Sequence, residues 1–434
     1  MAMHRTLALF AVTAAAGATR HAGDSRDVKS GDRNERAAAV NHTVSQIWQH
    51  GEGGCTCIGV PALIHTRNAT VLAFAECRMW TGDGCLPAKT AAAPALPGPC
   101  NGNHTCITMK RSEDGGRSWS AQHIVMHKGG NVMAVWDAVR SRVVLNYSPG
   151  QPYAKDPPYI EASAATLSTI GSTDSEQILS DVAWSRPRQI AQYPNGWASQ
   201  PGPGTAVQLR PGSAHAGRLV FAGWMHNNGR TCDVVVWMSD DGGDTFRQSA
   251  GGLINGTCET SLSQLGDGRI VLLGNDGGVV DKGGCSVTGT NTLQHYYSSD
   301  GGDSFGPVQC DAALVNADCQ APILAVGSSI VVANPEGRTH PPDPPGHGAF
   351  DRTNMVVHVS DDGKTFNALP VTFDTGGGVN ATPAGYSSLT FVNTNAPRTV
   401  GLGWETDGPG QSCKGEPGAG ARCRILFSVF DVPA

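Results

Sequence analysis

Long hydrophobic runs are scarce in this 434-residue sequence. Past the first residues, Gly, Pro and Asn interrupt every apolar segment before it reaches the ~20 residues that a membrane helix requires. Lysines and arginines form no basic stripe and the net charge is -6, so we expect neither nucleic acid nor a membrane as a partner. Helical 3.6-residue periodicity is almost absent as well. The remaining short apolar segments, such as RLVFAGW and DVVVWM, are closed by turn residues and predict an all-β fold.

The first residues read MAMHR and then TLALFAVTAAAGA, a basic start followed by a short apolar run, which is typical of a cleaved secretory signal. We expect a signal peptide over 1–20, a poorly ordered segment over 21–45 and one folded domain over 46–434. Asn-x-Ser/Thr glycosylation acceptors fit a secreted glycoprotein; they are Asn41, Asn68, Asn103, Asn255 and Asn380. Thirteen cysteines then predict disulfides, with one cysteine left over. Cys55-x-Cys57 lacks the spacing of a zinc site, so we expect no metal and no cofactor.

An internal repeat, Ser-x-Asp-x-Gly-x-x-Trp/Phe, decides the fold class. Copies begin at Ser112, Ser239 and Ser298, and a copy that is one residue shorter begins at Ser360. Ser and Asp side chains can cap local amides, and Gly supplies positive φ, so each copy predicts a hairpin turn. A calcium loop would need alternating ligands and a terminal Glu, which the repeat lacks.

The spacing of the repeats predicts how many structural units the domain contains. The last three copies start 59 and 62 residues apart (239, 298 and 360), and the first gap, from 112 to 239, is 127 residues. One four-stranded propeller blade needs about 60 residues, so the long gap should hold a blade whose turn has drifted. We therefore expect a six-bladed β-propeller with Asp-box turns.

The repeats resemble the Asp-boxes of sialidases, six-bladed propellers with the active site at the centre of one face. Val60-Pro61-Ala-Leu-Ile, followed by LAFAECR ending at Arg78, is similar to the strands that open the family's first blade. The resemblance implies that Asp83 is the general acid/base and that Arg78 contacts substrate. Taken alone, Asp83 in Thr-Gly-Asp-Gly-Cys would indicate only an Asx turn.

Two further segments resemble the family's catalytic pair. Glu259 begins a strand pair that turns at Asp267-Gly268, and Tyr386 precedes Ser-Ser-Leu. The resemblance implies that Tyr386 is the nucleophile and Glu259 its base. A tyrosine makes chemical sense, because a carboxylate nucleophile would be repelled by the carboxylate on the anomeric carbon of sialic acid. An exposed strand-end Glu259 and an ordinary half-buried Tyr386 remain the alternatives.

The expected arginines that bind the substrate carboxylate are incomplete. Arg352, shortly before the last repeat, matches one of the family's three, and a guanidinium suits a carboxylate. The family's Arg-Ile-Pro is replaced by Gly59-Val60-Pro61, which removes one of these arginines. The position expected for another falls near Asn275. Losing two such contacts weakens carboxylate binding by ~10² to 10⁴-fold. Gly202-Pro-Gly204 resembles a segment that lines the family's pocket.

Three functions remain open on the sequence. The first is an exo-α-sialidase acting on sialylated glycans, a secreted monomer in which Arg78, Arg352 and Asn275 orient the sugar. The second is a propeller glycosidase or lyase for a different sugar. The third is a glycan-binding propeller without turnover, although that class would be expected to lose Asp83, Glu259 or Tyr386 rather than arginines.

Overall fold

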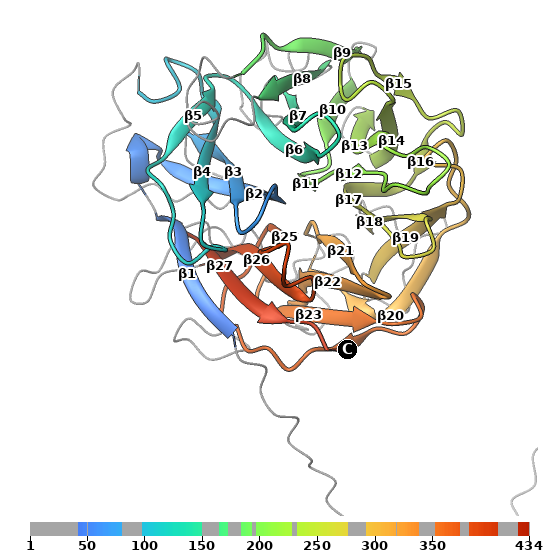
Figure 1. The fold of residues 1–434 in the computed structure, drawn as a ribbon. Helices are drawn as coiled ribbons and strands as arrows, with labels where there is room; N and C mark the ends of the chain where they lie inside the picture. Colours follow the sequence, from blue (N-terminus) through green and yellow to red (C-terminus); the bar gives the residue numbers. More distant parts are fainter. Residues whose placement is uncertain are drawn as a thin grey trace, which may run out of the picture. The chain divides into compact units, whose positions relative to one another are not determined.

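The computed structural model describes twelve ranges: 42–49, 51–79, 98–149, 165–171, 184–192, 197–227, 232–276, 292–317, 319–337, 352–373, 382–406 and 424–433. They belong to one compact unit, Ala38–Ala434, which is nearly all β. Six small sheets arranged in a ring form a six-bladed propeller (Figure 1), so the predicted fold class is confirmed. No helix in these ranges is long and apolar enough to cross a membrane.

The first three blades follow one another along the chain (Figure 1). Blade one contains β2 (Cys57–His65), β3 (Val71–Arg78), β4 (Thr105–Ser112) and β5 (His123–Met126). Blade two contains β6 (Gly130–Asp137), β7 (Arg142–Ser148), β8 (Ala165–Gly171) and β9 (Arg188–Gln192), and β11 (Gly204–Thr205) pairs in parallel with β6. Blade three contains β10 (Trp197–Pro201), β12 (Val207–Gln208), β13 (Leu219–Asn227), β14 (Cys232–Ser239), β15 (Arg247–Gln248) and β16 (Ile254–Asn255).

The last three blades complete the ring. Blade four contains β17 (Thr257–Gln264), β18 (Ile270–Asp276), β19 (Thr292–Ser298) and β20 (Gln309–Val315). Blade five contains β21 (Ile323–Val326), β22 (Ser329–Pro335), β23 (Met355–Ser360) and β24 (Asn367–Ala368). Blade six contains β25 (Ser387–Phe391), β26 (Thr399–Thr406), β27 (Arg424–Asp431) and β1 (His42–Gln49), which is followed by a short 3-10 helix, η1 (Glu52–Gly54). The N-terminal strand thus closes the last blade, and it begins within the segment expected to precede the domain.

The hydrophobic core lies between the blades rather than inside one sheet. Phe74 and Ile107 of blade one share a buried cluster with Val132 and Leu145 of blade two. All eight residues of β3 are buried, which is why VLAFAECR reads as a nearly continuous apolar run. Every blade therefore depends on its neighbours for burial of its apolar faces.

Each repeat lies in the turn between the third and fourth strands of its blade, as the first copy illustrates. Asp114 Oδ1 accepts the backbone N–H groups of Arg117 and Ser118, each at 2.9 Å. Ser112 Oγ accepts the N–H of Gly116, whose φ is 88°. The repeat residues therefore hold a local turn, as predicted, and the long gap between the first two copies contains blade two.

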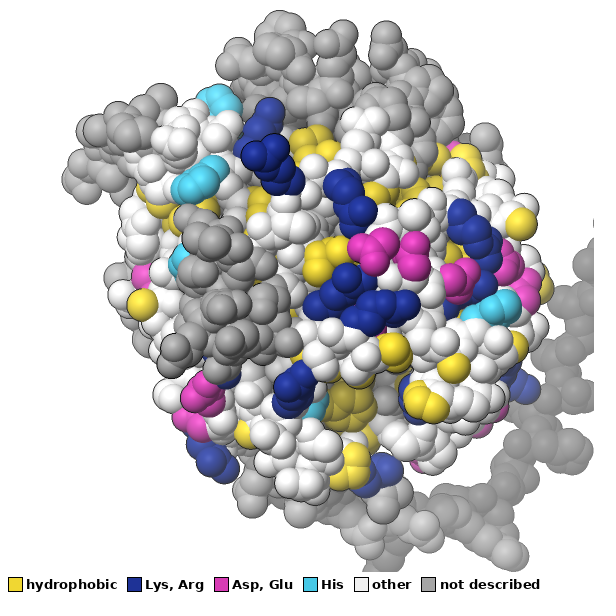
Figure 2. All heavy atoms as spheres, turned by 45° about the horizontal axis from the view of Figure 1, so that its top comes forward, with side chains coloured by type: hydrophobic (Ala, Val, Ile, Leu, Met, Phe, Trp, Pro, Cys, Tyr) yellow, Lys and Arg dark blue, Asp and Glu magenta, His cyan; other side chains and the backbone are white. Residues whose placement is uncertain are grey.

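Every one of these turns also offers a glycine carbonyl to the preceding blade. The donor and acceptor pairs are Ser45 with Gly116 (2.5 Å), Arg142 with Gly242 (2.7 Å), Arg218 with Gly301 (3.0 Å) and Tyr297 with Gly363 (2.9 Å). Acidic and basic side chains lie next to one another on the face drawn in Figure 2. Ion pairs accompany the carbonyl contacts, as between Arg218 and Asp303 at 3.2 Å. The turns therefore join neighbouring blades around the ring.

Acid should weaken the fold through the Asp-box carboxylates. Burial acts to raise the pKa of Asp114 and Asp241, but hydrogen bonds from Ser, Thr and backbone N–H groups outweigh it and lower each pKa to about 2. Backbone N–H groups of Thr365 and Lys364 lower the pKa of Asp362 to about 2 as well. Because these folded-state pKa values lie below those of the unfolded chain, their stabilisation is complete above about pH 4 and is lost as the pH falls toward about 2.

The free energy of unfolding, measured in urea across that pH range, should fall more steeply for the wild type than for Asp114→Asn. Glu113→Gln is the matched control, because it removes a neighbouring carboxylate that is 71% exposed and forms its ion pair with Arg111 of β4, outside the turn. An Asp114→Asn protein with the wild-type pH dependence would contradict this role for the carboxylate.

Candidate functional site

Three of the innermost strands carry the same irregularity near their N-terminal ends. Val60 in β2, Asn131 in β6 and Glu259 in β17 adopt left-handed conformations with φ of 56°, 46° and 44°. Each residue lies inside a register shift of its strand. Such bulges re-aim side chains and are common next to active sites, although the left-handed conformation costs roughly 1–2 kcal/mol for a non-glycine residue. The irregularity sets Glu259 apart from an ordinary strand residue.

Glu259 and Tyr386 come together from blades four and six. The Tyr386 hydroxyl donates a hydrogen bond to Glu259 Oε1 across 127 residues of sequence. The N-terminal end of β17 is anchored beside this contact by a disulfide between Cys258 and Cys232 of β14. A carboxylate that accepts the phenolic proton is placed to withdraw it, so the pair can serve as a nucleophile and its base.

Arg352 lies beside Tyr386. Its guanidinium carbon is 5.3 Å from the centroid of the Tyr386 ring, and the side chain is partly buried. The backbone holds the two residues together, because the Ala384 N–H donates to the Arg352 carbonyl at 2.9 Å. The structure therefore gathers Glu259 from blade four, Arg352 from the segment before β23 and Tyr386 from the segment before β25.

Arg78 is held in a buried ion pair with Glu76 of the same strand. Its Nε and Nη2 atoms lie 2.7 and 2.6 Å from Glu76 Oε2, and both side chains are almost fully buried. The other oxygen of Glu76 accepts the backbone N–H of Asn131 at 2.5 Å. The side-chain amide of Asn131 in turn donates to Gln200. The guanidinium charge of Arg78 is thus balanced, and the ion pair joins blade one to the bulge of blade two.

Asn275 contacts Glu259 directly. It lies opposite Cys258 in the pairing of β17 with β18, and its Nδ2 donates to Glu259 Oε2 at 2.9 Å. Gly59 pairs with Glu76 immediately before the bulge of β2. Asp83 lies outside the described residues, so its expected role stays a prediction.

Glu405 of β26 is a site residue that the sequence reasoning missed. Its side chain is 1% exposed, and its Oε1 and Oε2 accept the N–H groups of Val60 at 2.6 Å and Tyr386 at 3.2 Å. A Cβ on Gly385 would overlap this carboxylate, which explains the glycine before Tyr386. The signal available in the sequence was an acid inside an apolar strand, VGLGWET, and Glu76 in VLAFAECR carries the same signal.

Residues 101–395 match the BNR repeat-like domain family. The chain belongs to this family of sialidase-type propellers. A similar protein, the sialidase of Micromonospora viridifaciens, is 30% identical over an alignment of 267 residues that covers 56% of this chain and 37% of that protein. The chain thus spans little more than a third of the length of this curated relative.

Solved structures with the same fold include several sialidase-type proteins. The intramolecular trans-sialidase from Ruminococcus gnavus superposes with a TM-score of 0.61 at 13% identity, covering 89% of this chain and 97% of that one. The leech intramolecular trans-sialidase gives 0.59 at 13% identity, covering 90% and 70%. The Hadza microbial sialidase Hz136 gives 0.58 at 17% identity, covering 88% and 67%. At these identities the likeness establishes the propeller fold alone.

The Gly202-Pro203-Gly204 segment of this BNR repeat-like propeller packs behind Glu259. Through β11 it pairs with β6, and it approaches Thr260, the residue after Glu259. A Cβ on Gly202 would overlap the backbone oxygen of Thr260, and one on Gly204 would lie 3.1 Å from Ser261 Oγ. Glycine is required here because two backbones approach closely, which is the reason for the predicted Gly-Pro-Gly pattern.

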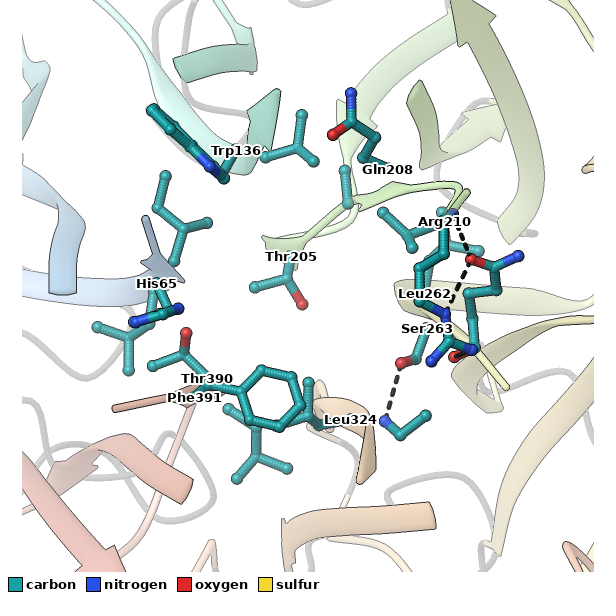
Figure 3. Close-up of a pocket in the computed structure, with 18 of the residues that line it drawn as sticks. His65, Trp136, Thr205, Gln208, Arg210, Leu262, Ser263, Leu324, Thr390 and Phe391 are labelled. Atoms are coloured by element: carbon teal, nitrogen blue, oxygen red, sulfur yellow. Dashed lines mark hydrogen bonds between the residues drawn. The ribbon is translucent and has the colours of Figure 1, made fainter. Parts of the chain in front are cut away.

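A cavity of about 410 Å³ opens at the other ends of the innermost strands. The strands β2 and β17 carry Val60 and Glu259 near their N-terminal ends but contribute Ile64, His65, Ser263 and Gln264 to this cavity. Figure 3 shows Thr205 of β11 among the ring of lining residues, with Trp136, Phe391 and Arg210 around it. Neither Glu259 nor Tyr386 lines the cavity, so it is separate from the candidate active site.

Gly202→Ala should displace the backbone that carries Glu259. We expect a loss of about 1–3 kcal/mol in the free energy of unfolding, because the added methyl group has no space beside Thr260. Gly306→Ala is the matched control, because its Cβ would make only an ordinary contact at 3.6 Å and neither glycine has positive φ. Urea unfolding of both variants measures the difference, and equal stability would contradict the close approach.

Proposed function

We propose that this protein is an exo-α-sialidase that removes terminal sialic acid, or a related nonulosonic acid, from glycoconjugates with retention of configuration. The observation that supports the proposal most strongly is the hydrogen bond from Tyr386 to Glu259. An ordinary pyranose does not require a phenol as nucleophile, whereas a sugar with a carboxylate at its anomeric carbon repels an acidic one. The sialidases among the similar proteins support the same substrate class.

Each proposed step has a named residue. Glu259 takes the phenolic proton as the Tyr386 oxygen attacks the anomeric carbon, and Asp83 protonates the departing glycosidic oxygen. Water then cleaves the tyrosyl-sugar bond, with Asp83 as its base and the proton returned through Glu259 to Tyr386. Arg352, beside the Tyr386 ring, holds the substrate carboxylate. The assignment of Asp83 rests on the sequence resemblance alone.

A different acidic sugar is the second candidate. It is favoured by Gly59 and Asn275, which occupy two places where the resemblance expects carboxylate-binding arginines. A glycan-binding propeller without turnover is less favoured, because Tyr386 and Glu259 are both present and in contact.

We place the activity outside the cytosol. Disulfides join Cys55 to Cys77, Cys100 to Cys106 and Cys232 to Cys258, and such bonds persist in oxidising compartments. A secretory-type N-terminal sequence agrees with this setting. The proposed enzyme acts as a monomer on sialylated glycans, and its mechanism uses side chains alone.

Tyr386→Phe should reduce hydrolysis of a fluorogenic aryl α-sialoside by at least about a thousandfold, because it removes the attacking oxygen and leaves the ring beside Arg352. Release of the fluorophore measures the rate, first with the sialoside and then with its deaminated analogue.

Tyr297→Phe is the matched control. Its hydroxyl donates to the Gly363 carbonyl at 2.9 Å, between blades four and five, so we expect a stability loss of about 1 kcal/mol and unchanged turnover. Hydrolysis that survives Tyr386→Phe would overturn the nucleophile assignment. A folded wild-type protein that cleaves neither substrate would favour another acidic sugar or a binding role.

A further inference from the structure

Asn275 makes a single described hydrogen bond, and its partner is Glu259. The side chain is 3% exposed, its Nδ2 lies 2.9 Å from Glu259 Oε2, and its Oδ1 has no partner among the described residues. An ionised carboxylate can only accept hydrogen bonds, so the amide nitrogen must be the atom that faces Glu259. The buried amide is therefore oriented by this one contact.

Both carboxylate oxygens of Glu259 accept hydrogen bonds. Tyr386 donates to Oε1 and Asn275 donates to Oε2, from blade six and from the neighbouring strand of blade four. The left-handed bulge at Glu259 brings the carboxylate to the side of the ladder occupied by Asn275. Rotation of the carboxylate away from Tyr386 would break the contact with Asn275, so the amide restricts its orientation.

A neutral donor suits a carboxylate that must accept a proton. An arginine at this place would pair with Glu259 as a cation and favour its charged form strongly, which opposes uptake of the phenolic proton. The amide supplies a hydrogen bond without a net charge. The contact with Glu259 uses one of the two N–H groups of an amide that is only 3% exposed, so little of the side chain is open to a sugar.

We infer that Asn275 is a positioning residue that holds Glu259 in line with Tyr386, and that it does not bind the substrate carboxylate. This inference rests on the proposed function. It departs from the substrate-binding role that the resemblance implies for this place, and it leaves Arg352 as the cation that lies beside Tyr386. Asn275 acts on the rate through the base, not on the affinity for the sugar.

Asn275→Leu, which keeps the approximate volume and removes the donor, should lower kcat for the aryl sialoside about tenfold or more and leave KM within about twofold. Asn275→Asp places a second carboxylate against Glu259, so the acidic limb of the kcat/KM profile should move to higher pH. A role confined to folding would change neither the pH profile nor the balance between kcat and KM.

Asn334→Leu is the matched control, because Asn334 of blade five is also buried and donates to the Val315 carbonyl of blade four at 2.5 Å. It should lower stability and leave the pH profile unchanged. A raised KM with wild-type kcat in Asn275→Leu would overturn the inference and assign Asn275 to substrate binding. If Asn275→Asp does not fold, the kcat and KM of Asn275→Leu decide alone. A wild-type protein that turns over no sialoside would instead defeat the proposed function, and this inference with it.

Discussion

The hydrogen bond from one blade to a glycine carbonyl of the next Asp-box turn is the contact that recurs around the ring, at four of its six blade junctions. The Ser and Asp of each repeat fold the turn locally, and the turn then presents its carbonyl to a neighbour. The donors are a serine, two arginines and a tyrosine, so the geometry recurs while the donor varies. Because β1 pairs with β27, the first and last parts of the described chain close the same blade and complete this series.

The closed ring brings acidic side chains together from distant parts of the chain. Glu259 is bonded by a phenol and an amide, and Glu405 by two backbone N–H groups. Glu76 forms an ion pair with Arg78. Buried carboxylates without such donors would be costly, so each of these contacts also stabilises the fold. The site is therefore built into the junctions between blades, and its chemistry cannot be separated from their packing.

Much of the candidate site could be located from short motifs. The strand LAFAECR, the Glu259 strand pair and the Tyr386 segment are local patterns, and in the structure Tyr386 donates a hydrogen bond to Glu259. The contact between Asn275 and Glu259 was not predictable, because it depends on the register of β18 against a bulged strand. A shift of one residue in that register would turn the side chain to the other face of the sheet.

The sequence by itself determined the all-β class, the repeated turns and the number of blades, because Ser, Asp and Gly act on neighbours within a few residues and their spacing reports the blade length. Only the tertiary structure decided which carboxylates would be buried, which donors would hold them and where the cavity of about 410 Å³ would lie. Some of these contacts depend on strand register, as between Asn275 and Glu259, and others join residues more than a hundred positions apart, such as Tyr386 and Glu259, whose meeting depends on the closure of the ring. No local propensity specifies contacts over that distance.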